Sequence, residues 1–168
     1  MAYLFVIIGV LFRLIPHPVN FAPILAIALF GGTYLNRKTA LWVPMSALII
    51  SDLFLGTYSP LLMLFVYAST LASCLLGLWL RNHKNVLNIV GISLVSAVIF
   101  YLFSNFGVWI MPSGYPHNWA GLIECYLMAI PFLKNSVASN LIYTAVFFGA
   151  YEMAQSLLRK RKLAATVK

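Results

Sequence analysis

Acidic residues are scarce in this sequence, with three Asp and Glu among 168 residues, and charged residues of both signs make up only 8%. A soluble domain carries about 25% charged residues, so this chain has too few to cover a water-facing surface. Hydrophobic residues make up 62% of it, and the mean hydropathy is +0.94. This composition is typical of an integral membrane protein, and the length predicts one transmembrane domain over residues 1–168.

Motifs for catalysis and for metal binding are also missing. The sequence has no HExxH, no GxSxG, no glycine-rich phosphate loop and no His/Cys cluster with zinc spacing. Cys74 and Cys125 lie in apolar runs and form no disulfide framework. We therefore expect no cofactor, no metal and no enzymatic activity. Acid–base chemistry by His17, Asp52 and Glu124 leaves a membrane-embedded enzyme as a less favoured alternative.

Long apolar runs fill most of the chain. A helix needs roughly 20 apolar residues to cross a membrane, which predicts an all-α bundle with six transmembrane helices and one re-entrant or interfacial helix. The re-entrant helix is expected over about 119–133, ending at Pro131. The six spans are expected at about 1–15, 21–36, 39–56, 60–80, 86–110 and 137–158.

Basic residues cluster at one set of span ends and fix the orientation. Lys and Arg accumulate in cytoplasmic loops, which predicts a multi-pass membrane protein with both termini cytoplasmic. The residues assigned to that side are Arg37, Lys38, Arg81, Lys84, the run 159–162 and Lys168. These basic residues stand at the cytoplasmic ends of the spans and account for most of the net charge of +8. We therefore expect contact with membrane lipid and no binding of nucleic acid.

Polar residues within the apolar segments gather at the opposite, outer side. A carboxylate inside a span is costly and usually faces a partner or a watery cavity. We therefore predict a substrate-binding site at the outer side. Its candidate residues are Arg13, His17, Asn20, Asp52, Asn105, Trp109, Tyr115 and Glu124.

The segment RLIPHPVNFAPI at residues 13–24 is expected to be the outer turn that forms one wall of this site. Pro16 and Pro18 stiffen the chain on both sides of His17 and present its imidazole on an extended segment. Two structural alternatives stay open. Asp52 could serve only as an ion-pair partner, and Arg13 could only snorkel at a helix end. The aromatic candidates Trp109 and Tyr115 are also typical of an interfacial belt.

Three small-xxx-small spacings concern packing. Ala22-x3-Ala26, Ala28-x3-Gly32 and Ser73-x3-Gly77 let helices approach closely, and such spacings are common in any bundle.

Five stretches resemble an uncharacterised family of small bacterial multi-pass membrane proteins. They are RLIPHPVNFAP (13–23), ALFGG (28–32), SDLFLG (51–56), NFGVW (105–109) and AIPFLKNS (129–136). That family in turn resembles the substrate-binding (S) components of energy-coupling-factor vitamin transporters and the solitary vitamin B12 transporters. The resemblance implies a six-helix bundle in the bacterial cytoplasmic (inner) membrane that binds a vitamin-like molecule, cobalamin included, near its extracytoplasmic face. His17 and Asp52 are the positions matched to polar ligand contacts.

The same resemblance implies either an energising ATPase with a membrane-coupling subunit, or solitary action. The Ala-x3-Ala docking surface found on helix 1 of many S components is absent from MAYLFVIIGVLF (1–12). The function predicted is therefore substrate binding and uptake, with a non-transporting structural or assembly protein as the alternative. A cavity reached from outside favours the first, and a tightly packed outer half favours the second.

Overall fold

The computed structural model describes residues 1–56, 58–112 and 114–166, so Lys168 lies outside the described residues. Over this part of the chain all regular secondary structure is helical, with seven helices and no strand. The helices are α1 (Ala2–Leu14), α2 (Ile24–Tyr34), α3 (Trp42–Leu55), α4 (Pro60–Leu80), α5 (Val86–Ile110), α6 (Trp119–Met128) and α7 (Ile130–Thr166).

Local sequence signals explain where several helices begin. Pro60 opens α4, where a missing backbone N–H costs nothing because the first turn has no intrahelical acceptor for it. Asn85 and Asn118 are the N-caps of α5 and α6, and their side chains accept hydrogen bonds from the N–H groups of Asn88 and Gly121. Helices α5 and α6 therefore begin directly after polar loop residues.

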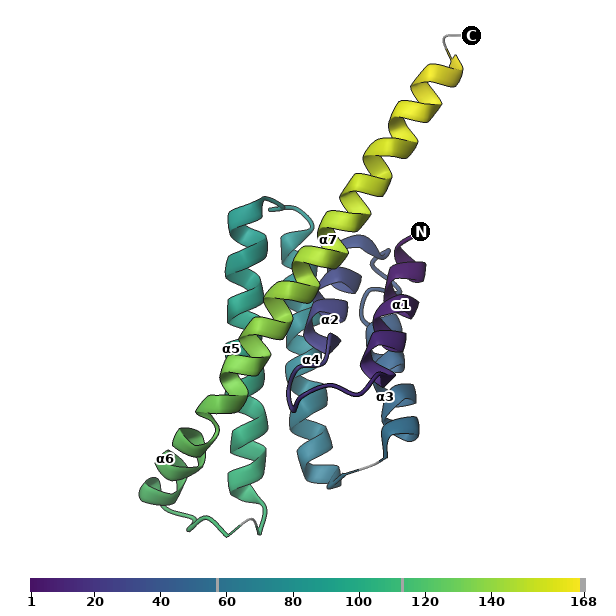
Figure 1. Cartoon of the computed structure of the whole chain (residues 1–168). Helices are drawn as coiled ribbons and strands as arrows, with labels where there is room; N and C mark the ends of the chain where they lie inside the picture. Colours follow the sequence, from purple (N-terminus) through teal and green to yellow (C-terminus); the bar gives the residue numbers. More distant parts are fainter. Residues whose placement is uncertain (57, 113, 167–168) are drawn as a thin grey trace.

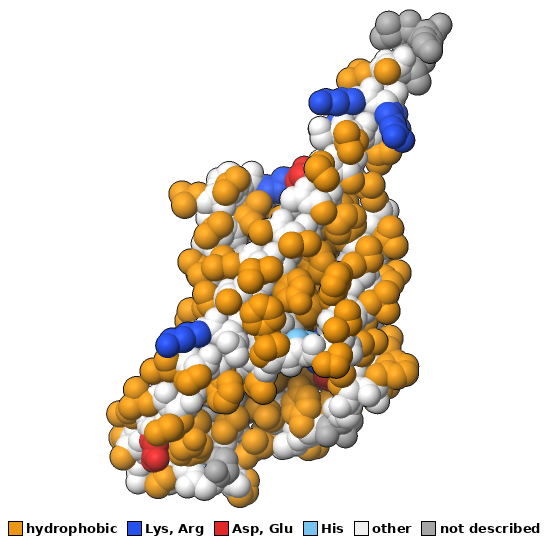
Figure 2. Space-filling model, in the orientation of Figure 1, with side chains coloured by type: hydrophobic (Ala, Val, Ile, Leu, Met, Phe, Trp, Pro, Cys, Tyr) orange, Lys and Arg blue, Asp and Glu red, His pale blue; other side chains and the backbone are white. Residues whose placement is uncertain are grey.

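The helices form one bundle around α2, and both chain ends lie toward the same end of it (Figure 1). Ten of the eleven α2 residues are buried, and α2 contacts α1, α3, α4, α5 and α7. Figure 2 shows apolar side chains over most of the visible surface and most of the visible basic side chains toward the end that holds the termini. Phe54 is 77% exposed and Leu87 is 81% exposed, so the surface is as apolar as the composition indicates.

The tightest helix contact joins α2 to α4 through two glycines. A Cβ atom built on Gly32 would lie 2.3 Å from the carbonyl oxygen of Cys74, and one built on Gly77 would lie 2.4 Å from that of Leu29. The Thr33 hydroxyl also donates to the Gly77 carbonyl oxygen across the contact, at 3.1 Å. Two of the small-xxx-small spacings, Ala28-x3-Gly32 and Ser73-x3-Gly77, therefore meet at one crossing.

The first three helices are shorter than the spans expected at 1–15, 21–36 and 39–56. They contain 13, 11 and 14 residues, or about 17–21 Å each at 1.5 Å per residue, whereas the hydrocarbon core is about 30 Å thick. Two helices, α4 and α5, are both long and apolar enough to cross a membrane in the described chain. The turn between α1 and α2 consequently stops well short of the far end of α4 and α5 (Figure 1), and its residues 14–19 are exposed.

The last part of the chain differs from the expected pattern at Pro131. The helix expected over 119–133 ends at Met128, and the next helix begins at Ile130 instead of about residue 137. Pro131 stands in the first turn of α7, where proline is tolerated, instead of ending a helix. As a result Lys134, Asn135 and Ser136 belong to a continuous helix of 37 residues.

Candidate functional site

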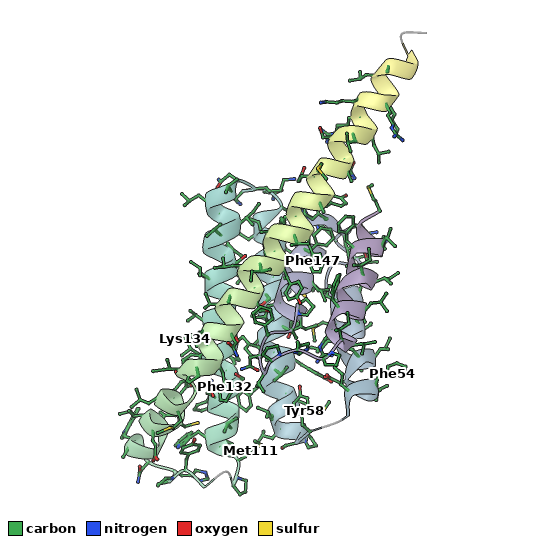
Figure 3. The ribbon with its side chains drawn as sticks, in the orientation of Figure 1. Phe54, Tyr58, Met111, Phe132, Lys134 and Phe147 are labelled. Carbon is green, nitrogen blue, oxygen red and sulfur yellow. The ribbon has the colours of Figure 1, made fainter. Side chains whose placement is uncertain are left out.

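A cavity of about 470 Å³ lies in the half of the bundle away from the termini. Figure 2 shows the surface hollowed in this half. Figure 3 places two of the lining residues there, Tyr58 beside the start of α4 and Phe132 near the start of α7. Most of the lining is apolar. The polar lining residues are Arg13, His17, Asn20, Tyr58, Ser104, Asn105, Tyr115 and Ser136.

The proline-rich segment between α1 and α2 forms one wall of this cavity. It is held by α7, because Asn135 donates through Nδ2 to the Val19 carbonyl oxygen at 3.0 Å and Ser139 donates to that of Ala22 at 2.9 Å. Asn20 has a left-handed backbone, with φ of 59°. Asparagine is one of the few residues other than glycine that adopt this conformation readily. Asn20 thus shapes the turn and lines the cavity.

Arg13, at the end of α1, lines the cavity and forms a buried ion pair. Its Nη2 lies 2.6 Å from Oδ1 of Asp52 on α3, and the two side chains are 10% and 3% exposed. Nη1 of Arg13 donates to the Ser51 hydroxyl, and Oδ2 of Asp52 accepts from the Tyr67 hydroxyl at 2.9 Å. The pair therefore ties α1, α3 and α4 together behind the cavity wall.

Tyr58 precedes α4 and lines the cavity from the α3–α4 turn. Burial raises the pKa of its hydroxyl to about 12, the Asp52 carboxylate adds to the rise, and Arg13 opposes it. The group therefore stays protonated at neutral pH. It offers the cavity both a hydrogen-bond donor and an acceptor.

Five of the eight predicted site residues line the cavity: Arg13, His17, Asn20, Asn105 and Tyr115. Of these, His17 is exposed, with Nδ1 3.0 Å from the Pro18 carbonyl oxygen, and Asn105 donates to the Tyr101 carbonyl oxygen of its own helix. Asp52 is 2% exposed and lies behind Arg13, outside the lining. The structural alternative for Asp52, an ion pair with Arg13, is therefore present.

The other two predicted residues lie elsewhere. The indole N–H of Trp109 donates to the Pro116 carbonyl oxygen and fixes the loop between α5 and α6. Glu124 is exposed on α6. Neither side chain is part of the cavity lining.

Sequence reasoning missed several lining residues because they are not conspicuous in an apolar chain. Tyr58 follows α3 in a turn. Ser104 shares a helix face with Phe100 and Val108, which stand four residues before and after it. Ser136 became a lining residue because α7 begins early and carries it beside Phe132. The helical spacing of Ser104 was a usable signal, whereas the start of α7 was not.

A second polar cluster stands at the end of the bundle that holds the termini. One guanidinium nitrogen of Arg81 donates to the carbonyl oxygens of Gly32, at 2.7 Å, and of Leu35, and so caps the C-terminal end of α2. Nearby, Glu152 on α7 pairs with Lys84 and accepts from the Tyr34 hydroxyl at 2.7 Å. These contacts close this end of the bundle around α2.

Among the side chains that the structure describes, no three His, Cys, Asp or Glu residues come together in one cluster. Comparison with the curated proteins found no match, and comparison with the solved structures found none either. A family model does match residues 1–163, nearly the whole chain. The chain therefore belongs to the family described as "Family of unknown function (DUF6580)".

Proposed function

We propose that this protein sits in the bacterial cytoplasmic membrane and binds a small vitamin-like molecule for uptake in the cavity between the proline-rich segment, α5 and α7. The observation that carries this proposal is the cavity itself, because 470 Å³ lies within the range of about 300–1,000 Å³ typical of small-molecule sites. A mostly apolar lining with a few polar groups is also the usual character of such sites.

The membrane placement is supported by the apolar surface, by the two long apolar helices α4 and α5, and by the asymmetry of charge. The run 159–162, with Lys84 and Arg81, marks the end that holds both termini, which we place in the cytoplasm. The cavity then faces the opposite side. This placement does not require six complete crossings of the membrane, because the short helices α1 and α2 pack against each other within the bundle.

The cavity also narrows the ligand class. The lining residues include one cation, Arg13, whose charge is matched by Asp52, and no carboxylate among those described. An uncharged or weakly charged ring compound with hydrogen-bonding groups fits this lining best. Cobalamin, with a corrin ring and a nucleotide loop, is much larger than a drug-sized ligand, so the volume favours a smaller vitamin.

Purification in mild detergent from cells grown in rich medium, followed by mass spectrometry of the bound small molecules, tests the proposal. We expect one stoichiometric compound that is retained by the wild type and lost from Asn20→Gly and His17→Ala. Asn20→Gly removes the amide and keeps the left-handed backbone, so the fold is preserved. Asn82→Gly and His83→Ala, exposed substitutions at the opposite end, are the matched controls and should keep the compound.

An empty protein that also fails to bind a panel of vitamins, cobalamins included, would reverse the proposal. The polar groups of the outer half would then serve packing, and a structural or assembly role would take its place.

A further inference from the structure

A groove of about 350 Å³ runs between α5 and α7 in the half of the bundle nearer the termini. The two helices pack together lower in the bundle and separate toward this end (Figure 1). On α5 the groove is lined by Val86, Ile89, Val90 and Ser93, which share one helix face over about 10 Å. Its α7 wall contains Thr144, Phe148 and Gly149.

This groove lies on the exposed surface of the bundle and is almost wholly apolar. Val86 is 79% exposed and Val90 is 42% exposed. Gly149 is also exposed, and a Cβ atom built on it meets nothing within 4 Å. The Ser93 hydroxyl already donates to the Ile89 carbonyl oxygen of its own helix. A long apolar chain could therefore lie along α5 without displacing protein atoms.

Positive charge surrounds the end of the groove that is nearest the termini. Lys84 stands directly before α5, and its Nζ lies 4.8 Å from the centre of the Tyr34 ring. Arg159 lies on the same face of α7 as Glu152, seven residues or about 10 Å farther along the helix, and Glu152 lines the groove. The positive end of the α5 dipole points the same way. Two cations and a helix N-terminus therefore oppose one carboxylate.

That carboxylate does not block an anion. Glu152 already accepts hydrogen bonds from Lys84 and Tyr34. The Lys84–Glu152 pair is exposed, at 36% and 48% of the two side chains, and exposed pairs of this kind contribute little to stability. Lys84 has three N–H donors and can share them between Glu152 and a second anion.

We propose that the groove is a binding site for an anionic phospholipid of the cytoplasmic leaflet. One acyl chain lies along Ile89, Val90 and Phe148, and the phosphate faces Lys84, Arg159 and the first turn of α5. A phospholipid matches the two features at once, an apolar tail and an anionic head, and basic pockets between helices on the cytoplasmic side suit such headgroups. This lipid site rests on the proposed membrane placement, and it is independent of the ligand in the outer cavity.

Native mass spectrometry of the protein in mixed micelles with equal amounts of phosphatidylglycerol and phosphatidylcholine tests the site. We expect the wild type to retain phosphatidylglycerol in preference. Lys84→Gln should weaken that binding about fivefold, the effect of one basic residue near a membrane surface, and leave phosphatidylcholine unchanged. Gly149→Phe should fill the groove and abolish the bound lipid.

Gly91→Phe is the matched control. Gly91 is also a helical glycine with open space around it, but it lies outside the groove lining, so lipid retention should stay at the wild-type level. Ala145→Leu fills the same groove by a smaller step and replaces Gly149→Phe if that variant does not fold.

Equal retention of the two lipids by the wild type would overturn the lipid site, as would equal losses from Gly149→Phe and Gly91→Phe. A change of oligomeric mass in Gly149→Phe with lipid retention unaltered would also overturn it and assign the groove to a protein partner. Failure of the protein to enter micelles or vesicles at all would instead count against the membrane placement.

Discussion

We predict that removing the Asp52 carboxylate lowers the stability of the folded protein, because the carboxylate forms a buried ion pair. Asp52 and Arg13 form an ion pair at 2.6 Å with side chains 3% and 10% exposed. In Asp52→Ala the Arg13 guanidinium would keep the Ser51 hydroxyl and the Leu48 carbonyl oxygen as hydrogen-bond acceptors. It would lose the carboxylate that balances its charge. Breaking a buried pair by removing one partner costs about 3–5 kcal/mol, because the remaining charge is left uncompensated.

A double-mutant cycle separates the interaction free energy of the ion pair from the other contributions of Arg13 and Asp52. Arg13→Met and Asp52→Leu should each destabilise strongly, whereas the double variant removes both charges and should lose much less than the sum. Replacement of a buried pair by apolar residues is often neutral or even stabilising. We therefore expect a coupling free energy of at least about 2 kcal/mol, near the upper part of the range for contacting residues.

The assay is reversible unfolding of the purified protein in detergent micelles, followed by circular dichroism. Glu124→Ala is the control, because it removes an exposed carboxylate on α6 and should change stability by no more than about 0.5 kcal/mol. Additive effects of the two single variants, or a fully stable Asp52→Ala, would refute the structural role of the pair.

Three further predictions follow from buried contacts. Gly77→Ala would place a Cβ atom 2.4 Å from the Leu29 carbonyl oxygen and should cost about 1–3 kcal/mol, whereas Gly91→Ala meets open space and should gain up to about 1 kcal/mol; thermal unfolding of the two compares them. Thr144→Val keeps the side-chain shape and removes a buried hydroxyl without a partner, so chemical denaturation should show a gain of about 1 kcal/mol or no loss. Arg81→Met leaves two carbonyl oxygens at the end of α2 without their donor and should lower stability by about 1.5–3 kcal/mol; unchanged unfolding would contradict the capping role.

The all-helical class and the order of the helices could be predicted from the apolar runs and the polar breaks between them. The bounds of α4 and α5 agree with the expected segments at 60–80 and 86–110, because Pro60 and Asn85 mark their starts in the sequence. The lengths of α1 to α3 could not be predicted. An apolar loop residue that is buried by neighbours looks the same in the sequence as an apolar residue in a helix.

The candidate site was predictable as a region more than as a set of side chains. The clustering of polar residues at one end of the expected spans identified Arg13, His17 and Asn20, which the structure places around one cavity. Whether a polar side chain faces that cavity depends on helix rotation, which a run of apolar residues does not encode. Asp52 and Arg13 are a clear case, because both are polar and close to a helix end, and only Arg13 reaches the cavity.

The burial of α2 constrains the order in which the chain can assemble. This helix spans only about 17 Å and is enclosed by helices that are synthesised before and after it, α7 among them. In the membrane placement that we propose, α2 is too short to cross the bilayer as an independent span. Under that placement we expect α1 and α2 to stay at the membrane surface until α4 supplies the glycine crossing. The fold closes only when α7 docks over the proline-rich segment, so the outer cavity is one of the last features to form.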